Sequence, residues 1–583
     1  RSARLAEVEE YPYWKPDGSE EYETEESYTF AASIAGNMTC KDAIDKHGDP
    51  ANDSITAEML QLVHKRAIQP VSWNSLNDDD KKRIIPSKMF LKAKHKPDGS
   101  FERLKARIVA RGDRQNRTLY DEDLSAGTVS SMSVMAIAAI ASHEERKVAV
   151  VDITGAFLHA EMDEENPVYV RIEPILAAIL VKHYPEQFQG FIDPKTKSLL
   201  VKLLKALYGT IEAAKRWLVE LLTTLNKEGY TCNDYDKCVL NFTDSTGTQC
   251  TICLYVDDLF ITCKNQSTIQ QLVQALKDKY GDVKAQYGDI VDYLGMTLDF
   301  TKKGCTKITM DGMIQEIISE FPTDLAVAKT PATESLLDTT ESTTLCETDR
   351  KLFHSMVARL MYVCKKVKPE CLMAVNFLAT RVQVATEEDN EKLERVIRYL
   401  KYACIKDQRG ILLRIGESGV RVATKIDAAH GVHMDYKSHT GAATGIGESA
   451  IVDYYSGKQS IVAKSSTEAE LIGATDLANQ SIKLRNFIIA QGYQPMPAII
   501  YQDNQSAIAL INKGSPGSMR SRHIGIRYFW LHEQCEREIV EIIYLSTKLM
   551  GAASILTKPV VGSQFIVERD DLTNWNKDVC DQY

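Results

Sequence analysis

The spacing of apolar and polar residues along the first half of the chain predicts both strands and helices. Two strands are expected around a turn at 97–100, a buried strand begins at residue 147, and 249–263 has the pattern of a hairpin with a charged centre. A further strand is expected over 292–300. Apolar residues recur with helical spacing in four segments, which are 54–73, 133–145, 203–230 (after a strand-like start and a Gly break) and 267–281.

The second half of the chain has a different pattern. A Thr- and Ser-rich stretch over 330–349 is typical of a linker, and helices are predicted over 349–367 and 387–405. A new unit begins near Arg421, where strand patterns such as "RVATKIDAAHG" alternate with helix patterns such as "KSSTEAELIGATDLANQ". This alternation favours a second, smaller α/β domain.

Composition and charge refine this picture. The 583 residues are 44% hydrophobic and 26% charged, as expected for several globular domains. The net charge of −10 argues against a nucleic-acid partner, but the stretch 81–114 is strongly basic, and phosphate binding needs only local positive charge. A solvated basic face is the alternative interpretation. Residues 1–55 read as an acidic, weakly ordered leader, because they are rich in Glu and Ser and poor in aliphatic residues.

Two further sequence features exclude some functions. No apolar run is long enough to span a bilayer, and the start "RSARLAEVEE" has no secretory signal core, so no membrane partner is expected. The start also lacks Met, which we expect of a piece of a longer product. Cys250 and Cys253 form a CxxC pair without a second ligand pair, so we interpret them as core residues rather than a zinc site.

Two adjacent carboxylates, Asp257 and Asp258, interrupt the apolar hairpin pattern at 249–263. An unpaired carboxylate is costly to bury, so a core hairpin needs a reason to keep such a pair. A third acid, Asp152, follows the Val-rich strand that begins at residue 147. Two strands that each end in acid can bring these carboxylates together, and divalent cations such as Mg²⁺ would then offset their repulsion. Two such ions support nucleotidyl transfer.

Four segments resemble, in the same order, those of reverse transcriptases of the Ty1/copia class of long-terminal-repeat retrotransposons. "YVDD" is similar to the YxDD box, and "VVDITGAFLHAEM" to the first-acid segment VDVKTAFLHG. "LKARIVARGD" and "LKALYGTIEAAKRW" resemble YKARLVARG and LKKSLYGLKQAPRAW. One departure is the run 211–214, where Ile-Glu-Ala-Ala replaces Lys-Gln-Ala-Pro. The ordered set identifies the chain as similar to an RNA-directed DNA polymerase.

The resemblance implies roles for individual residues. Asp152, Asp257 and Asp258 would bind two Mg²⁺ (or Mn²⁺) ions in the palm. Phe157 would be an aromatic gate that excludes a ribose 2′-hydroxyl, although the residues alone favour a core aromatic. The remaining contacts to the incoming nucleotide would come from Lys105 and Arg107, which suit phosphate oxygens, and from Tyr208 and Gly209 beside the pocket.

The C-terminal unit resembles the ribonuclease H domain of the same class. The segments "KIDAAHG", "STEAELIGA" and "YQDNQSA" supply three acids of a second two-metal site, Asp427, Glu470 and Asp503. Glu468 is the rival of Glu470, because the family's STEAE carries both. The family typically ends in Ala-Asp-Ile-Leu-Thr-Lys-Pro, whereas this chain has Ser554 in place of the Asp. A hydroxyl is a poor Mg²⁺ ligand, so we expect a weakened or inactive nuclease.

The fold class implied is α+β. A right-hand polymerase with fingers, thumb and an antiparallel palm sheet would be followed by a helical connection and an α/β ribonuclease H-like domain. The expected divisions are a leader (1–55), fingers and palm (56–300), thumb and connection (301–418), a nuclease-like domain (419–565) and a tail (566–583).

The resemblance also implies partners and a location. The partners are an RNA template, a DNA or tRNA primer, an RNA–DNA hybrid, deoxynucleoside triphosphates and the integrase of the same polyprotein. Activity is expected in a cytoplasmic virus-like particle, with delivery of the DNA product to the nucleus. The alternative is a catalytically decayed remnant that binds nucleic acid. A nuclease on an inert polymerase scaffold is disfavoured by Ser554.

Overall fold

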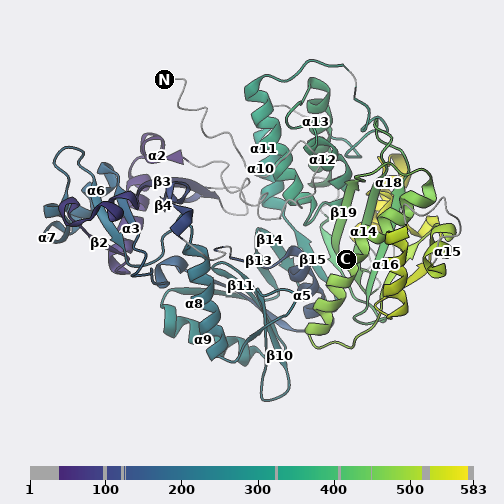
Figure 1. Ribbon diagram of the computed structural model, residues 1–583, viewed down its shortest axis with the longest axis horizontal. Coiled ribbons are helices and arrows are strands. Elements are labelled where there is room, and N and C mark those ends of the chain that lie inside the picture. Colours follow the sequence, from purple (N-terminus) through teal and green to yellow (C-terminus); the bar gives the residue numbers. More distant parts are fainter. Residues whose placement is uncertain are drawn as a thin grey trace.

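A computed structural model gives the fold (Figure 1). The leader residues 1–37 and the tail residues 576–583 lie outside the described ranges. Residues 38–55, which we expected to be weakly ordered, instead form β1 (Met38–Thr39), α2 (Cys40–His47) and the start of α3 (Asp49–His64). Their small apolar residues are buried against the first sheet, and this corrects the leader boundary. The described residues are 38–95, 101–119, 124, 126–321, 326–339, 341–404, 409–447, 449–514 and 525–575.

The first sheet, which we call the fingers sheet, contains the predicted strand pair around 97–100. These strands are β3 (Ile84–His95) and β4 (Phe101–Ala110), and they pair antiparallel. Among the described residues, β4 pairs with no strand other than β3, so its other edge is open to a helix. The sheet order is β1-β3-β6-β7-β2, with β6 at Tyr169–Ile172, β7 at Leu199–Leu203 and β2 at Ile68–Pro70.

The second sheet, the palm sheet, is antiparallel throughout. It contains the predicted hairpin over 249–263, and its order is β12-β5-β11-β10-β9-β8. Helix α5 (Ser131–His143) is apolar on all sides and is almost wholly buried beside this sheet. The strands are β5 (Lys147–Ile153), β8 (Thr231–Cys232), β9 (Val239–Thr243), β10 (Gln249–Tyr255), β11 (Asp258–Cys263) and β12 (Val283–Tyr287).

Helices cover the palm sheet as predicted, and one predicted strand is divided. Helices α8 (Ala213–Lys227) and α9 (Gln266–Tyr280) match the expected helical segments. The segment 292–300 is instead the centre of a hairpin, because Leu294 and Gly295 take positive φ angles of 52° and 75° and turn the chain. This third sheet has the order β13-β14-β15-β16, with strands Ile290–Tyr293, Met296–Asp299, Thr306–Thr309 and Ile411–Leu413.

The stretch 330–346 has no helix or strand among its described residues, but it is not a loose linker. Leu336 and Leu337 are buried, and the backbone N–H of Leu345 donates to the carbonyl of Ala385 (2.9 Å). The high Thr and Ser content led to the prediction of a linker, although the few apolar residues of the stretch are buried. The helices around it are α10 (Asp311–Glu320), α11 (Glu347–Cys364), α12 (Leu372–Ala379) and α13 (Glu387–Tyr402).

The C-terminal domain is built on a mixed sheet of order β19-β18-β17-β20-β21. Strands β17, β18 and β19 are antiparallel, while β20 and β21 run parallel to β17. The strands are β17 (Val422–Ala429), β18 (His439–Ile446), β19 (Ala450–Lys458), β20 (Ala498–Gln502) and β21 (Val540–Tyr544), and the helices are α14 (Ser466–Ala490), α15 (Gln505–Lys513), α16 (Gly525–Glu536), α17 (Gly551–Ser554) and α18 (Gly562–Thr573).

Two features of the C-terminal domain depart from or extend the expectations. Helix α18 continues to Thr573, and Leu572 and Trp575 are buried, so the described residues after 565 are part of the packed domain rather than a tail. The domain also packs on the palm: Asn233 Nδ2 donates to the Phe487 carbonyl (3.2 Å). Figure 1 shows α14 and β19 beside α5 on the right of the palm sheet.

Candidate functional site: two groups of acids

The three palm acids meet at the end of the β10–β11 hairpin. Asp152 on β5 and Asp258, the first residue of β11, are direct partners in the antiparallel register, so their backbones lie side by side. Asp257 lies in the two-residue turn that connects β10 to β11. The backbone N–H of Ile153 donates to the Asp257 carbonyl (3.0 Å), which ties this turn to the end of β5.

The turn holds Val256 in a conformation that β-branched residues rarely adopt. Its φ angle is +55°, in the left-handed region. Such strain persists only when neighbouring groups fix it. Here the indole Nε1–H of the buried Trp217, on α8, donates to the Val256 carbonyl (2.6 Å). Trp217 thereby fixes the orientation of the turn that presents Asp257.

Electrostatic interactions link the palm acids to two cations of the fingers. Burial raises the pKa of Asp257, the negative charge of Asp152 raises it further, and Arg107 and Lys105 act in the opposite direction. Burial followed by the charge of Asp257 raises the pKa of the Tyr208 phenol. The predicted nucleotide-contacting side chains therefore lie within electrostatic range of the acids.

Tyr208 is the centre of an aromatic and cationic contact beside the acids. The Phe157 ring meets it edge-on, with centroids 4.4 Å apart, and the Arg107 guanidinium lies 4.9 Å from its ring centroid. Phe157 is 7% exposed, in a short 3₁₀ helix (Ala156–His159) that follows β5. It is thus both a core aromatic and a neighbour of Tyr208.

Gly209 allows the backbone after Tyr208 to meet the end of β4. The N–H of Gly112 donates to the Gly209 carbonyl (3.0 Å) and the N–H of Ala110 to the Tyr208 carbonyl (2.8 Å). A Cβ atom at Gly209 would lie 2.2 Å from the Ala110 oxygen, and its φ angle is +87°. A residue with a side chain does not fit here without displacing β4.

Helix α3 covers the open edge of β4, which the sequence did not reveal. The hydroxyl of Ser54 donates to the Leu104 carbonyl (3.1 Å) and accepts from the Ala106 N–H (3.0 Å). Glu58 Oε1 accepts from the Ile108 N–H (3.1 Å). The positive charges of Arg107 and Lys105 also act on Glu58, whose pKa burial raises. These polar residues satisfy edge groups that would otherwise be unpaired. Their helical spacing was the only signal in the sequence.

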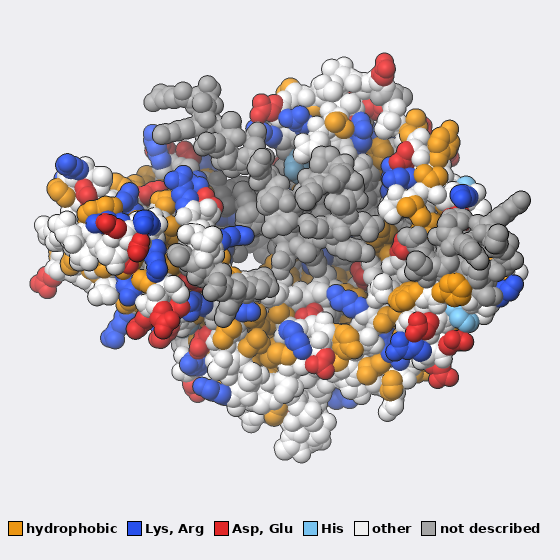
Figure 2. Space-filling model, viewed as in Figure 1, with side chains coloured by type: hydrophobic (Ala, Val, Ile, Leu, Met, Phe, Trp, Pro, Cys, Tyr) orange, Lys and Arg blue, Asp and Glu red, His pale blue; other side chains and the backbone are white. Residues whose placement is uncertain are grey.

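The basic stretch forms one exposed face of the β3–β4 pair. Lys92 lies directly opposite Lys105 in the register, and like charges in such a pair destabilise a sheet. Figure 2 shows Lys and Arg side chains gathered over the part of the molecule where β3 and β4 lie in Figure 1. A face of this kind favours the binding of a polyanion. The exposed cations of this basic face are Lys88, Lys92, Arg103, Lys105 and Arg107.

A second group of acids lies in the C-terminal domain. Asp427 lies on β17, two residues before its end, Glu470 is on α14 and Asp503 follows β20. One carboxylate oxygen of each lies within 4.8 Å of the others. In the described part of the chain this is the only group of three carboxylate, His or Cys ligands drawn so close. Neighbours orient each acid: Thr557 Oγ1 donates to Asp427 Oδ2 (3.0 Å), Gln502 Nε2 to Glu470 Oε2 (3.1 Å) and Thr547 Oγ1 to Asp503 Oδ2 (2.7 Å).

Mutual repulsion and burial disfavour ionisation in this group. Burial raises the pKa of Glu470 to about 9, and the charges of Asp427 and Asp503 contribute. The pKa of Asp427 is also raised, again mainly by burial. Carboxylates gathered this closely fit a hard divalent cation such as Mg²⁺ or Mn²⁺, which takes oxygen ligands. All three acids predicted for this domain are brought together.

The helix separates Glu470 from its rival. Glu468 lies near the start of α14, where its Oε2 accepts from the backbone N–H of Lys464 (2.9 Å) and its own N–H donates to the hydroxyl of the capping residue, Ser465. Glu470, two residues on, points to a different side of the helix and joins the acid group. Ser554 is buried on α17, and its carbonyl accepts from Thr557.

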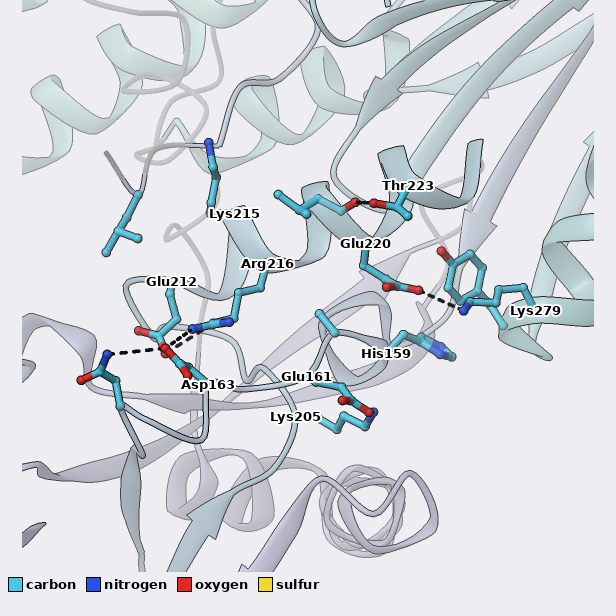
Figure 3. Close-up of a pocket in the computed structure, with 15 residues that line it drawn as sticks. His159, Glu161, Asp163, Lys205, Glu212, Lys215, Arg216, Glu220, Thr223 and Lys279 are labelled. Carbon is cyan, nitrogen blue, oxygen red and sulfur yellow. Dashed lines mark hydrogen bonds and ion pairs between the residues drawn. The ribbon is translucent and has the colours of Figure 1, made fainter. Parts of the chain in front are cut away.

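A cavity of about 980 Å³ contains none of the predicted site residues among the residues that line it. It lies along α8, and Figure 3 shows most of its labelled charged side chains close to an oppositely charged one, while Lys215 stands apart. Lys205 contacts Glu161 (2.8 Å), Arg216 contacts Asp163 (3.6 Å) and Lys279 contacts Glu220 (3.3 Å). This mutual compensation gives the cavity no clear ligand.

The fold, the palm hairpin and the second acid group define a polymerase-like protein with a nuclease-like C-terminal domain. Residues 71–334 match the family described as reverse transcriptase (RNA-dependent DNA polymerase), so this segment is a reverse transcriptase domain. The curated relatives of the chain are Pol polyproteins of the Ty1/copia type from plant and yeast transposons. The family predicted from the four sequence segments is therefore confirmed.

Three relatives illustrate the similarity. The Pol polyprotein of transposon TNT 1-94 of Nicotiana tabacum is 28% identical over 495 residues, which is 83% of this chain and 35% of the relative. The Pol polyprotein of transposon RE2 of Arabidopsis thaliana is 26% identical, over 92% of this chain and 35% of the relative. The Ty1-BL Gag-Pol polyprotein of Saccharomyces cerevisiae is 24% identical, over 86% of this chain and 28% of the relative. The chain spans about a third of the length of these relatives.

Solved structures of foamy viral protease–reverse transcriptase are also similar. The one in complex with an RNA/DNA hybrid has a TM-score of 0.47 and 12% identity, over 86% of this chain and 54% of that chain.

No helix in the described ranges combines the length and the apolar character that crossing a membrane requires.

Proposed function

We propose that this chain is an RNA-directed DNA polymerase that acts within a longer Pol polyprotein of the Ty1/copia type. Its reaction is nucleotidyl transfer at Asp152, Asp257 and Asp258. The observation that carries the proposal is the pairing of Asp152 with Asp258 across β5 and β11, with Asp257 held in a strained turn beside them. The reverse transcriptase match over residues 71–334 supports the same reaction.

The palm carboxylates fit divalent cations because they supply only oxygen ligands and repel one another without a counter-charge. Such ions, when bound, activate the primer hydroxyl and stabilise the leaving pyrophosphate. The protein's own side chains orient the substrate: Arg107 and Lys105 bind triphosphate oxygens, and Tyr208 forms the floor against which Arg107 rests. Phe157 packs under this floor and limits the space beside the sugar.

The basic face of β3 and β4 binds the nucleic acid backbone. We infer that its substrates are an RNA template annealed to a DNA or tRNA primer, with deoxynucleoside triphosphates. A row of exposed Lys and Arg side chains on one face of the strand pair attracts phosphates. Binding would therefore weaken steeply as salt concentration rises.

Primer extension tests the polymerase. Extension of oligo(dT) on poly(rA) with Mg²⁺ should be lost in the double variant Asp257→Ala, Asp258→Ala. The matched control is Asp234→Asn, which removes a carboxylate from an exposed loop of the same domain and should leave extension unchanged. A folded chain that binds hybrid but extends nothing, in Mg²⁺ or Mn²⁺, would favour the decayed remnant.

A second activity, cleavage of the RNA strand of a hybrid, is supported by the group of Asp427, Glu470 and Asp503. Their oxygens lie within 4.8 Å of one another and fit a divalent cation that would supply an activated water. The change Asp427→Asn should abolish Mg²⁺-dependent hybrid cleavage and leave primer extension intact. Ser554→Asp should raise cleavage if the missing acid limits it. No gain from that change would reject this explanation of a weak nuclease.

A further inference from the structure

We propose that Glu568, on α18, is a further ligand for the divalent cation that Asp427, Glu470 and Asp503 hold, on the side of the site where Ser554 supplies no carboxylate. This inference rests on the proposed nuclease function of the C-terminal domain. Nothing in the sequence segments that carry the resemblance points to Glu568, and it follows from how α17 and α18 pack on β17.

The packing brings the side of α18 that carries Glu568 toward the strand that carries Asp427. Lys425 and Asp427 are two residues apart on β17, so their side chains leave the same face of the strand. Lys425 Nζ contacts both carboxylate oxygens of Asp571 on α18 (2.9 and 3.2 Å). Glu568 lies one helical turn before Asp571 on the same side of α18. Glu568 therefore lies on the side of α18 that carries the contact to β17.

The charges on these groups support the same placement. The negative charge of Asp427 acts on Glu568, and the positive charge of Lys558 acts on both carboxylates. Lys558 is exposed and forms no ion pair with either of them within 4.0 Å in the described part of the structure. Lys558 thus influences both carboxylates but pairs directly with neither.

One carboxylate oxygen of Glu568 lacks a hydrogen-bond partner among the described residues. Glu568 is only 8% exposed. Gln564 Nε2 donates to Oε1 (2.8 Å), whereas Oε2 is out of contact with solvent and has no hydrogen-bond partner among the described residues. A buried carboxylate oxygen without a partner is strongly unfavourable unless a cation or donor meets it. A divalent cation between Glu568 and Asp427 would meet this need.

The contacts of α17 explain why Glu568 reaches this position and Ser554 does not replace it. A Cβ atom at Gly551 would lie 3.2 Å from Glu568 Cγ, so the glycine leaves room for the glutamate stem. Ser554, one turn further along α17, carries only a hydroxyl, which is a weak ligand for a hard cation. The carboxylate that α17 lacks is supplied by the adjacent helix.

The test measures Mn²⁺ binding directly, by the loss of the free-ion electron paramagnetic resonance signal. The full chain would carry Asp257→Asn and Asp258→Asn, so that the palm contributes no site. In this background Glu568→Gln should weaken Mn²⁺ binding by roughly 10- to 100-fold, as loss of a ligating or orienting group does. Glu541→Gln, an exposed acid of the same domain, is the matched control and should change binding less than about twofold.

A second variant separates ligation from packing. Glu568→Asp keeps the charge but withdraws it by one methylene, so a ligand role predicts binding between that of the native chain and Glu568→Gln. A packing role predicts the reverse order, because Gln preserves the shape of Glu. Adding Ser554→Asp to Glu568→Gln should restore much of the lost binding and of the hybrid cleavage.

The outcomes distinguish this inference from the proposed nuclease. If Asp427→Asn abolishes Mn²⁺ binding but Glu568→Gln leaves it unchanged, the inference fails and the nuclease site stands. If neither variant alters Mn²⁺ binding and the native chain cleaves no hybrid, the nuclease proposal fails and takes this inference with it.

Discussion

The two acidic sites of this protein are assembled in different ways. In the palm, Asp257 and Asp258 are neighbours in sequence, and one antiparallel register places Asp152 opposite them. In the C-terminal domain, the acids come from a strand, a helix and the residue after another strand, and they meet through the packing of α14 on the sheet. A site formed by pairing of neighbouring strands can be predicted from a short sequence motif. A site formed by packing depends on the helices that cover the sheet.

The largest effect that should separate the two sites is expected from a change on the fingers side of the palm site. Arg107→Gln removes the guanidinium that lies over Tyr208. The positive charge of this group opposes the rise in the pKa of Asp257 that burial causes. We expect kcat/KM for deoxynucleotides to fall on the order of 10²- to 10³-fold, because a charge-assisted phosphate contact is lost. Steady-state extension assays measure this, while cleavage of a preformed hybrid should not change.

The matched control is Arg171→Gln, because Arg171 also lies over an aromatic ring, that of Trp73 (6.0 Å), but on another part of the fingers sheet. It should alter kcat/KM less than about threefold, as expected for an exposed cation–π pair. Equal losses in the two variants would mean that Arg107 acts through general sheet stability or net charge.

The next prediction concerns the close contact that positions Tyr208. Gly209→Ala should lower the free energy of unfolding by about 3 kcal/mol or more, because overlap with β4 adds to the strain of a positive φ, and each contributes about 1–3 kcal/mol. Gly247→Ala has a similar φ of +79° with nothing within 4 Å, so it should lose only about 1 kcal/mol. Urea denaturation measures both, and equal losses would show that the approach to β4 is unimportant.

In the C-terminal site, repulsion among the acids should be visible as a pH dependence of stability. The folded pKa of Glu470, about 9, lies above its ordinary value of 4.5, so the folded state holds the proton more tightly than the unfolded state. The resulting penalty is absent below about pH 4.5, grows as pH rises and is complete above about pH 9. Glu470→Gln should therefore stabilise the metal-free protein at pH 8.5 by about 1–3 kcal/mol.

Melting temperatures in EDTA measure this gain, which should disappear at pH 4.5. Adding Mn²⁺ should reverse the sign, since the ion stabilises the native carboxylates and not the glutamine. Glu541→Gln is again the control. A variant that is less stable than the native chain at pH 8.5 without metal would contradict the account of a repulsive acid group.

The smallest expected effect is at the support of the palm turn. Trp217→Phe keeps an aromatic ring but removes the hydrogen bond to the Val256 carbonyl. We expect a loss of about 1 kcal/mol in stability and a fall of about tenfold in kcat, because the strained turn is less firmly held. Trp73→Phe, at an exposed tryptophan, should leave both quantities unchanged. An unchanged kcat in Trp217→Phe would show that the strand register alone positions Asp257.

The sequence predicted the parts of the molecule that local patterns determine. The hairpin at 249–263 and the order of the four polymerase segments depend on neighbouring residues, so they were predictable. The ambiguity between Glu468 and Glu470 needed the helix phase, which only the packing of α14 fixes. The contacts of Trp217, Glu58 and Glu568 could not be predicted from the sequence, because each acts on a segment far from it in sequence.

The boundaries were the least predictable features for a similar reason. The acidic composition of the leader hid the small apolar residues of α2 and α3, and the polar stretch 330–346 hid Leu336 and Leu337. In each case a few buried residues decide whether a segment packs. The composition of a segment averages over these few residues, whereas its packing depends on where each side chain lies.

The most direct test of the account is a crossover experiment on one substrate. Single-turnover reactions on a labelled RNA template with a DNA primer would report DNA extension and RNA cleavage together, for Asp152→Asn and for Asp427→Asn. The account predicts that Asp152→Asn loses extension but still cleaves a preformed hybrid, and that Asp427→Asn does the opposite. Loss of both activities in either variant, or of neither, would contradict the claim that the two groups of acids are separate catalytic sites.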